Sequence, residues 1–163
     1  REKPPSLVEL IRRVVGQNNT KVQCLPSADY AVGTILGVER KKVGNLVSSM
    51  VLVRGTTTEL WDQLRRCQSR YSHVVLLVEG ELLATPDPAT CLADSRHRKV
   101  PYMSVQATIA KAELEGVVVL WTNDQQETAM ILKWLRTAVQ QPSSGWGQRN
   151  VELGTASMSS ERS

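Results

Sequence analysis

The sequence contains no phenylalanine and only 4% aromatic residues, so its core must rest on valine, leucine, isoleucine, methionine and tryptophan. It has three cysteines, and their spacing fits neither a zinc site nor a disulfide framework. Its two histidines, His73 and His97, have no metal-ligand partner at a useful spacing. We therefore expect Cys24, Cys67 and Cys91 to be reduced thiols in an intracellular protein.

No apolar run approaches the roughly 18 residues of a membrane span, and the opening R-E-K-P-P is not typical of a signal peptide. The 163 residues, 41% hydrophobic and 22% charged, suffice for one globular domain with a sizeable core. The net charge of +4 is compatible with nucleic-acid binding but is also usual for a soluble surface. Basic residues gather around one stretch and on the helix predicted after it: Arg40, Lys41, Lys42, Arg54, Arg65, Arg66 and Arg70.

That stretch, residues 35–45, runs from an apolar strand pattern directly into three charges, Glu39, Arg40 and Lys41. On a strand, residues two apart share a face, so Glu39 and Lys41 should point together and Arg40 the other way. A second acid, Asp29, lies ten positions before Glu39. Two carboxylates can hold a hard divalent cation, and a nearby lysine can orient water or a phosphate oxygen. These are the parts of metal-assisted phosphodiester hydrolysis; the alternative is an ordinary solvated strand end.

Apolar periodicity, capping residues and turn residues predict the order of helices and strands. The first half is predicted as a helix over residues 4–16 opened by a Ser6–Glu9 capping box, then strands over 21–25, 30–32 and 35–41, with a turn at Gly33 and a bulge at Gly37. A helix over 43–50 and a helix capped by Thr58 and reaching about residue 71 follow. The second half is predicted as a buried strand over 73–78, a helix over 104–115, a buried strand over 117–121, and a helix opened by an Asp124–Glu127 capping box and ended by Pro142. Strands that alternate with helices predict an α/β layer fold with a partly parallel sheet.

Two segments lack such periodicity. Residues 82–101 form a long connection, which we expect to be functional or mobile. Residues 142–163 are polar and rich in serine and glycine, which predicts a disordered tail or linker after a domain at residues 1–141. The connection carries the basic residues Arg96, Arg98 and Lys99, which could contact phosphates or simply keep it soluble. The tail carries Trp146, which could anchor a partner.

Several other residues have two interpretations. Glu79 and Glu81 flank the end of the buried strand and could face the site, although acids at a strand end are usually solvated. Trp61, Trp121 and Trp134 occupy apolar positions of helices or a strand. We expect these three rings in the core rather than stacked on bases.

The stretch from Asp29 to Lys41, D-Y-x(8)-E-R-K, resembles the G-D-Y…E-R-K signature of XPF-type structure-specific endonucleases. V-V-L-L-V-E-G, E-L-W-D-Q-L and N-D-Q-Q-E-T-A resemble further family segments, and the opening R-E-K resembles the end of the D-x-R-E motif. The resemblance covers roughly residues 1–141. It implies an α/β fold of the restriction-endonuclease-like type, with a mixed central sheet flanked by helices.

The resemblance also implies roles for individual residues. Asp29 and Glu39 would be ligands of Mg²⁺ or Mn²⁺, and Lys41 would assist the attacking water or steady the phosphate. Arg40 would support the site or contact the DNA backbone. The family cuts one strand of branched DNA, at flap, fork or bubble junctions, in repair or recombination. The DNA contacts expected on this basis are Arg40, Lys42, Arg54 and Gln63.

The resemblance further implies a homodimer, or a heterodimer with a related nuclease-family subunit, and no membrane. The helix beside the basic connection and the helix after Asp124 are the candidate dimer surfaces. In a eukaryote, the expected compartment is the nucleus.

The chain departs from the family pattern at several positions. Asn45 stands where the family usually has an aspartate, Ala28 where it favours glycine, and Glu59 where an arginine is common. The aspartate of D-x-R-E, with the first strand of the fold, would lie before Arg1, and a tandem helix-hairpin-helix domain is not present in the chain. These departures support a second hypothesis, a catalytically inactive domain that is a DNA-binding and dimerisation scaffold for an active partner.

Overall fold

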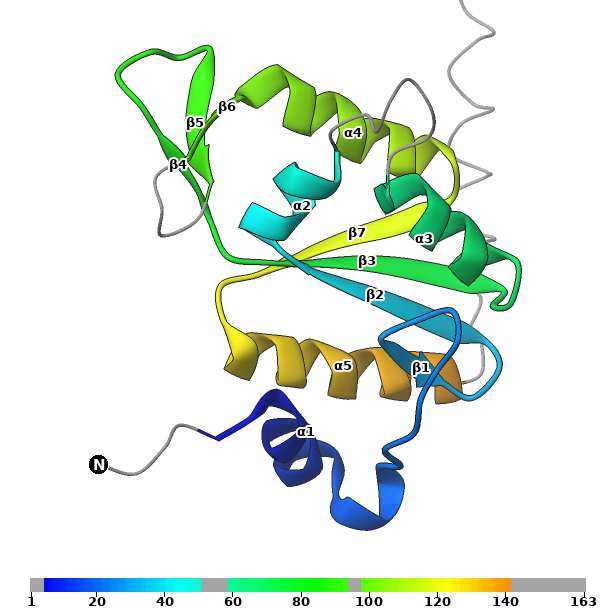
Figure 1. Ribbon diagram of the computed structural model, residues 1–163. Coiled ribbons are helices and arrows are strands. Elements are labelled where there is room, and N and C mark those ends of the chain that lie inside the picture. The colour runs from blue at the N-terminus through cyan, green and yellow to red at the C-terminus, as the bar shows by residue number, and fades with distance from the viewer. Residues whose placement is uncertain (1–4, 51–58, 94–97, 142–163) are drawn as a thin grey trace, which may run out of the picture.

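The structure is a computed structural model that describes residues 5–50, 59–93 and 98–141 (Figure 1). The predictions for Arg54, the Thr58 cap, Arg96, His97, Trp146 and the tail after residue 141 lie outside the described residues. The elements are α1 (Leu7–Val15), the 3-10 helix η1 (Gln17–Asn19), β1 (Tyr30–Val32), β2 (Leu36–Lys42), α2 (Val43–Ser49), α3 (Glu59–Gln68), β3 (His73–Glu79), β4 (Leu82–Ala84), β5 (Thr90–Ala93), β6 (Arg98–Pro101), α4 (Tyr102–Leu114), β7 (Val117–Thr122) and α5 (Gln125–Gln140).

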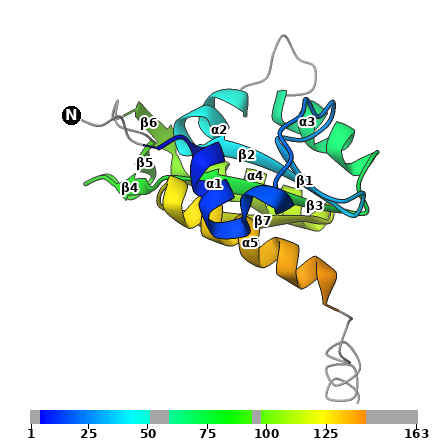
Figure 2. The same ribbon diagram turned by 90° about the horizontal axis from the view of Figure 1, so that it is seen from below.

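The main sheet has the strand order β1-β2-β3-β7. β1 pairs antiparallel with β2, whereas β2, β3 and β7 are parallel. Helices α2, α3 and α4 cover one face, and α1 and α5 cover the other, as Figure 1 and the view from below in Figure 2 show. The predicted α/β fold, a mixed central sheet flanked by helices, is confirmed.

Two apolar cores form on the two faces because the side chains of β3 alternate between them. Val74, Leu76 and Val78 pack with helices α2, α3 and α4. Val75 and Leu77 pack with α1 and α5. All the residues of β3 after His73 are buried, as the continuous apolar run H-V-V-L-L-V predicts for a central strand.

The predicted strand at residues 21–25 is wrong, because this segment is irregular and pairs with no strand among the described residues. The predicted bulge at Gly37 is also wrong, because the pairing of β1 with β2 runs through Gly37 without interruption. The glycine serves close packing instead. A Cβ atom there would lie 2.6 Å from Cys67 Sγ and closer still to the ring of Tyr71.

The long connection at residues 82–101 is not a simple loop. It contains a second antiparallel sheet with the order β4-β5-β6. Cys91 and Val100 of this sheet are buried and join the core beneath α2 and α4. Its strands are only three or four residues long, too short to show a clear period in the sequence.

The predicted burial of β7 and of two tryptophans is wrong as well. β7 is an edge strand, so Val118 and Trp121 stay 53% and 40% exposed. Trp134 on α5 is 62% exposed. Trp61 is half-buried against the core, with Lys111 Nζ 4.6 Å from the centre of its ring. In the described part of the chain, no helix has both the length and the apolar character that crossing a membrane requires.

Candidate active site

Asp29 is fixed against β2 by its own side chain. It lies just before β1, where its backbone N–H donates to the carbonyl of Val38 at 3.0 Å. Its Oδ2 accepts a hydrogen bond from the backbone N–H of Arg40 at 2.8 Å. The side chain thus extends the β1–β2 ladder by one bond, which places the carboxylate beside Glu39.

Glu39 and Lys41 share the face of β2 that looks toward α3. Lys41 Nζ lies 3.5 Å from Glu39 Oε1, and the side chains are only 12% and 8% exposed. Burial raises the pKa of the Glu39 carboxyl, and the negative charge of Asp29 raises it further, while Lys41 and Arg66 lower it. The Glu39 carboxyl is therefore harder to ionise than an exposed glutamate, and perturbed carboxyl groups of this kind are common at functional sites.

Asp29 and Glu39 line one small, polar pocket of about 160 Å³, which we call the acidic pocket. Gln63 and Arg66 line it from α3, and the irregular segment 25–28 lines it as well. Among the described residues, no group of three or more histidine, cysteine, aspartate or glutamate side chains is placed so that it could hold a metal ion. Two carboxylates nevertheless suit Mg²⁺, which usually takes one or two protein carboxylates and completes its shell with water and phosphate oxygens.

The amide of Gln63 is held by its own helix. Its Nε2 donates to Glu59 Oε1 at 3.1 Å, one turn earlier on α3. Its Oε1 is buried and has no hydrogen-bond partner. The free end of this side chain is thus an acceptor, and the predicted DNA contact of Gln63 stays a prediction.

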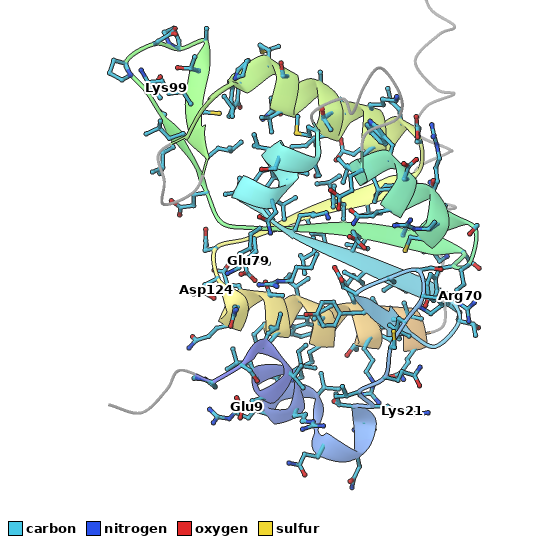
Figure 3. The ribbon with its side chains drawn as sticks, in the orientation of Figure 1. Glu9, Lys21, Arg70, Glu79, Lys99 and Asp124 are labelled. Atoms are coloured by element: carbon cyan, nitrogen blue, oxygen red, sulfur yellow. The ribbon has the colours of Figure 1, made fainter. Side chains whose placement is uncertain are left out.

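Arg40 points to the opposite face of β2, as the strand alternation predicts. Its Nε donates to Glu79 Oε2 at 2.9 Å, and its second guanidinium nitrogen contacts Glu79 Oε1 at 2.5 Å. Thr128 of α5 donates to Glu79 Oε2 at 2.7 Å and shares a 2.8 Å hydrogen bond with Thr122. Glu79 lies at the end of β3, above the start of α5 and near Asp124 (Figure 3).

The charges of Arg40 and Glu79 are paired within one network of hydrogen bonds, which also includes Thr122 and Thr128. Burial of Glu79 opposes its ionisation, but the hydrogen bonds from Arg40 and Thr128, with the charges of Arg40 and Lys42, lower its pKa. The guanidinium of Arg40 is therefore engaged away from the acidic pocket, and only its backbone N–H contacts Asp29. The roles predicted for Arg40 in catalysis and DNA contact stay predictions.

The remaining predicted residues lie around the site rather than in it. Lys42 is exposed at the end of β2, and Glu81 is exposed just after β3. Asn45, the position that departs from the family pattern, is exposed on α2 and does not line the acidic pocket. Lys99 is exposed on β6.

Arg66 belongs to the acidic pocket, although the sequence alone marks it only as one of several basic residues on a helix. A signal was present, because Arg66 follows Gln63 by three positions and such residues share a helix face. Choosing between Arg65 and Arg66 required knowing which face of α3 meets β2.

Comparison with known proteins identifies the family. A family model described as the ERCC4 domain matches residues 1–135. The chain is 29% identical over 129 residues to the Fanconi anemia group M protein of Gallus gallus, covering 78% of this chain and 6% of that protein. It is 29% identical over 110 residues to the 3'-flap repair endonuclease Xpf of Saccharolobus solfataricus, covering 67% of this chain and 41% of that protein.

Two solved structures resemble the fold. XPF from Aeropyrum pernix superposes with a TM-score of 0.65 at 23% identity, covering 87% of this chain and 59% of that one. The same protein in complex with DNA superposes with a TM-score of 0.54 at 25% identity, covering 81% and 59%. The chain thus spans well under two thirds of the relatives that it matches. It belongs to the ERCC4 domain family, that of the XPF-type nucleases which its D-Y…E-R-K stretch resembles.

Proposed function

We propose that this chain is the nuclease domain of a metal-dependent endonuclease that cuts branched DNA at flap, fork or bubble junctions during repair or recombination. The observation that carries the proposal is that Asp29 and Glu39 line one pocket, with Lys41 paired to Glu39. A relative named as a 3'-flap repair endonuclease and a similar structure in complex with DNA support it.

In this proposal Asp29 and Glu39 hold Mg²⁺ or Mn²⁺, and the Arg40 N–H keeps one Asp29 oxygen oriented. The bound cation would polarise a phosphoryl oxygen and lower the pKa of a coordinated water. Lys41 lies within reach of the same carboxylate, so its ammonium can donate to that water or to the phosphate. Lys42, Arg54 and Arg40 are the proposed contacts to the DNA backbone, and Gln63 is a further proposed DNA contact.

The direct test is cleavage of labelled flap and fork DNA by the full protein with Mg²⁺ or Mn²⁺. Glu39→Ala should reduce cutting by more than the roughly 10–100-fold that is typical of removing a supporting group around a metal. Glu81→Ala is the matched control, because Glu81 is an exposed acid outside the acidic pocket. Absence of cutting, or equal cutting by the wild-type protein and Glu39→Ala, would contradict the proposal.

A second candidate function is a catalytically inactive scaffold that binds DNA and pairs with an active subunit. Asn45 and Glu59 favour it, because each replaces a residue type that the resemblance leads us to expect. Fork binding that needs no metal and is accompanied by no cutting would support the scaffold over the nuclease.

Both candidate functions include a dimer with an identical or related nuclease-family subunit. The supporting observation is that the edge strand β7 and helix α5 carry exposed large apolar side chains: Val118, Trp121, Met130 and Trp134. Met130 and Trp134, four positions apart on α5, share one face of the helix, and exposed apolar patches often mark interaction surfaces. Sedimentation should detect a dimer that Trp134→Glu weakens, and a wild-type protein that stays monomeric at high concentration would remove this part of the proposal.

A further inference from the structure

The acidic pocket has a second wall whose contribution is not explained by metal binding. Gln63 and Arg66 come from α3, and they line this pocket of about 160 Å³ together with Asp29 and Glu39. Gln63 is poorly suited to bind a phosphate oxygen, because its amide nitrogen already donates to Glu59 and its unpartnered atom is an acceptor. Arg66 is therefore the donor that this wall can offer to an anion.

The guanidinium of Arg66 is free for such a contact. It makes no hydrogen bond or ion pair with any residue that the structure describes, although its charge lowers the pKa of Glu39. Lys41, by contrast, is already paired with Glu39. A planar guanidinium that is exposed and unpaired at the rim of a pocket can bind phosphate with two parallel hydrogen bonds.

The balance of charges in the pocket also favours a bound anion. The negative charges of Asp29 and Glu39 are matched by the positive charges of Lys41 and Arg66. A divalent cation would then leave two positive charges in excess. A phosphodiester and a hydroxide together carry two negative charges, so the pocket would be neutral with both in place.

We propose that Arg66 binds the scissile phosphate from the α3 side of the acidic pocket, opposite the acids that would hold the cation. This inference rests on the proposed nuclease function for the identity of its substrate, a DNA phosphodiester. Arg66 differs in this from Arg65, its neighbour on α3, which is exposed but does not line the pocket. Arg65 therefore provides a matched control of equal charge on the same helix.

The test compares Arg66→Gln, Arg66→Lys and Arg65→Gln in the full protein. The first measurement is the single-turnover rate of fork cleavage at saturating DNA with Mg²⁺. Arg66→Gln should be about a hundredfold slower, as for loss of one donor to a developing charge. Arg66→Lys should recover part of the rate and Arg65→Gln should match the wild-type protein. Equal rates for Arg65→Gln and Arg66→Gln would overturn the inference.

The second measurement does not depend on cutting. Fork affinity is measured against salt concentration with Ca²⁺ in place of Mg²⁺, using a DNA just long enough to cover the junction. Arg66→Gln should reduce the salt slope by about one, and Arg65→Gln should not. If the wild-type protein fails to cut but this difference appears, the nuclease proposal fails and the phosphate contact of Arg66 stands. If both variants keep the wild-type slope, the contact is refuted whether or not the protein cuts.

Discussion

The two faces of β2 treat charge in opposite ways. On the face toward α5, Arg40 is paired with Glu79 by two hydrogen bonds, and Thr128 donates a further hydrogen bond to Glu79 Oε2. On the face toward α3, Glu39 is buried beside a second acid, and burial raises its pKa. The Arg40–Glu79 pair is thus satisfied within the protein, whereas a buried acid with a raised pKa beside a second acid is typical of a functional site. Three consecutive residues, Glu39 to Lys41, thus contribute to structure and to the candidate site in alternation.

The largest effect should come from Glu39→Gln, which keeps the shape of the side chain and removes its charge. Cleavage of fork DNA should fall by more than a hundredfold, since the cation would lose one of its two carboxylates. The free energy of unfolding should not fall, because the variant relieves repulsion with Asp29. Cleavage assays and urea denaturation on one preparation check both statements. A variant that loses stability together with cleavage would contradict the expected difference between the two faces.

Glu79→Gln should have the opposite effect, a loss of stability. It leaves the largely buried guanidinium of Arg40 without a counter-charge, which costs about 3 kcal/mol of unfolding free energy. Urea denaturation measures the loss. Glu81→Gln is the control, because Glu81 is exposed outside the network. Equal stability of the two variants would show that the Arg40–Glu79 pair is not structural.

Gly37→Ala tests the packing on the Glu39 face of β2. The new methyl group would overlap Cys67 Sγ and the Tyr71 ring, and overpacking of this kind costs about 1–3 kcal/mol. Thermal unfolding should show a clear decrease in midpoint. Gly33→Ala offers a comparison, since a Cβ at Gly33 meets no atom within 4 Å and that substitution is strained only by its positive φ of 57°. A Gly37→Ala protein as stable as wild type would mean that α3 can move away from the sheet.

The decrease in unfolding free energy at acidic pH should depend on Glu79. Its pKa in the folded protein is lowered below the ordinary value of 4.5, so its contribution is fully present above that pH. The contribution is lost as the pH falls below 4.5 toward the folded pKa. Unfolding free energy measured from pH 6 to pH 3 should therefore decline less steeply in Glu79→Gln than in the wild-type protein. Parallel curves would contradict the lowered pKa.

The smallest effect concerns thiol reactivity. Cys24 is exposed, whereas Cys67 and Cys91 are buried. Burial, with the charges of Glu39 and Asp29, raises the pKa of Cys67 to about 11, so it has little thiolate at neutral pH. A thiol reagent should label one cysteine per native chain at neutral pH and three after denaturation. Rapid labelling of Cys67 in the native protein would show that the Glu39 face is more open than the structure indicates.

Local signals in the sequence were sufficient for much of the fold. The capping box of α1 forms as predicted, with Ser6 N–H donating to Glu9 at 2.6 Å and Ser6 Oγ accepting from the Glu9 N–H. Asp124 caps α5 through the N–H groups of Gln126 and Glu127. The carboxylate of Glu127 bonds to Asn123 instead of closing the predicted box with Asp124. These features depend on residues within one helical turn.

The failures all concern contacts between distant segments. Alternation at residues 21–25 predicts a strand, but a strand requires a partner, and none lies beside this segment among the described residues. The apolar run of β7 cannot tell an edge strand from a central one, so Trp121 was expected to be buried. Arg66 was not selected because its position depends on how α3 is rotated against β2. The residue types suggest Asp29 and Glu39 as a pair and the resemblance supports it, but their spacing of ten positions does not by itself bring them together.

Arg40 joins the two layers of the molecule through one residue. Its peptide N–H orients Asp29 on one side of the sheet, and its side chain reaches Glu79 and, through it, Thr128 of α5 on the other. Met130 and Trp134, on the outer surface of the same helix, are exposed. A subunit that docked there and displaced α5 would therefore also shift Arg40, whose backbone N–H orients the Asp29 carboxylate.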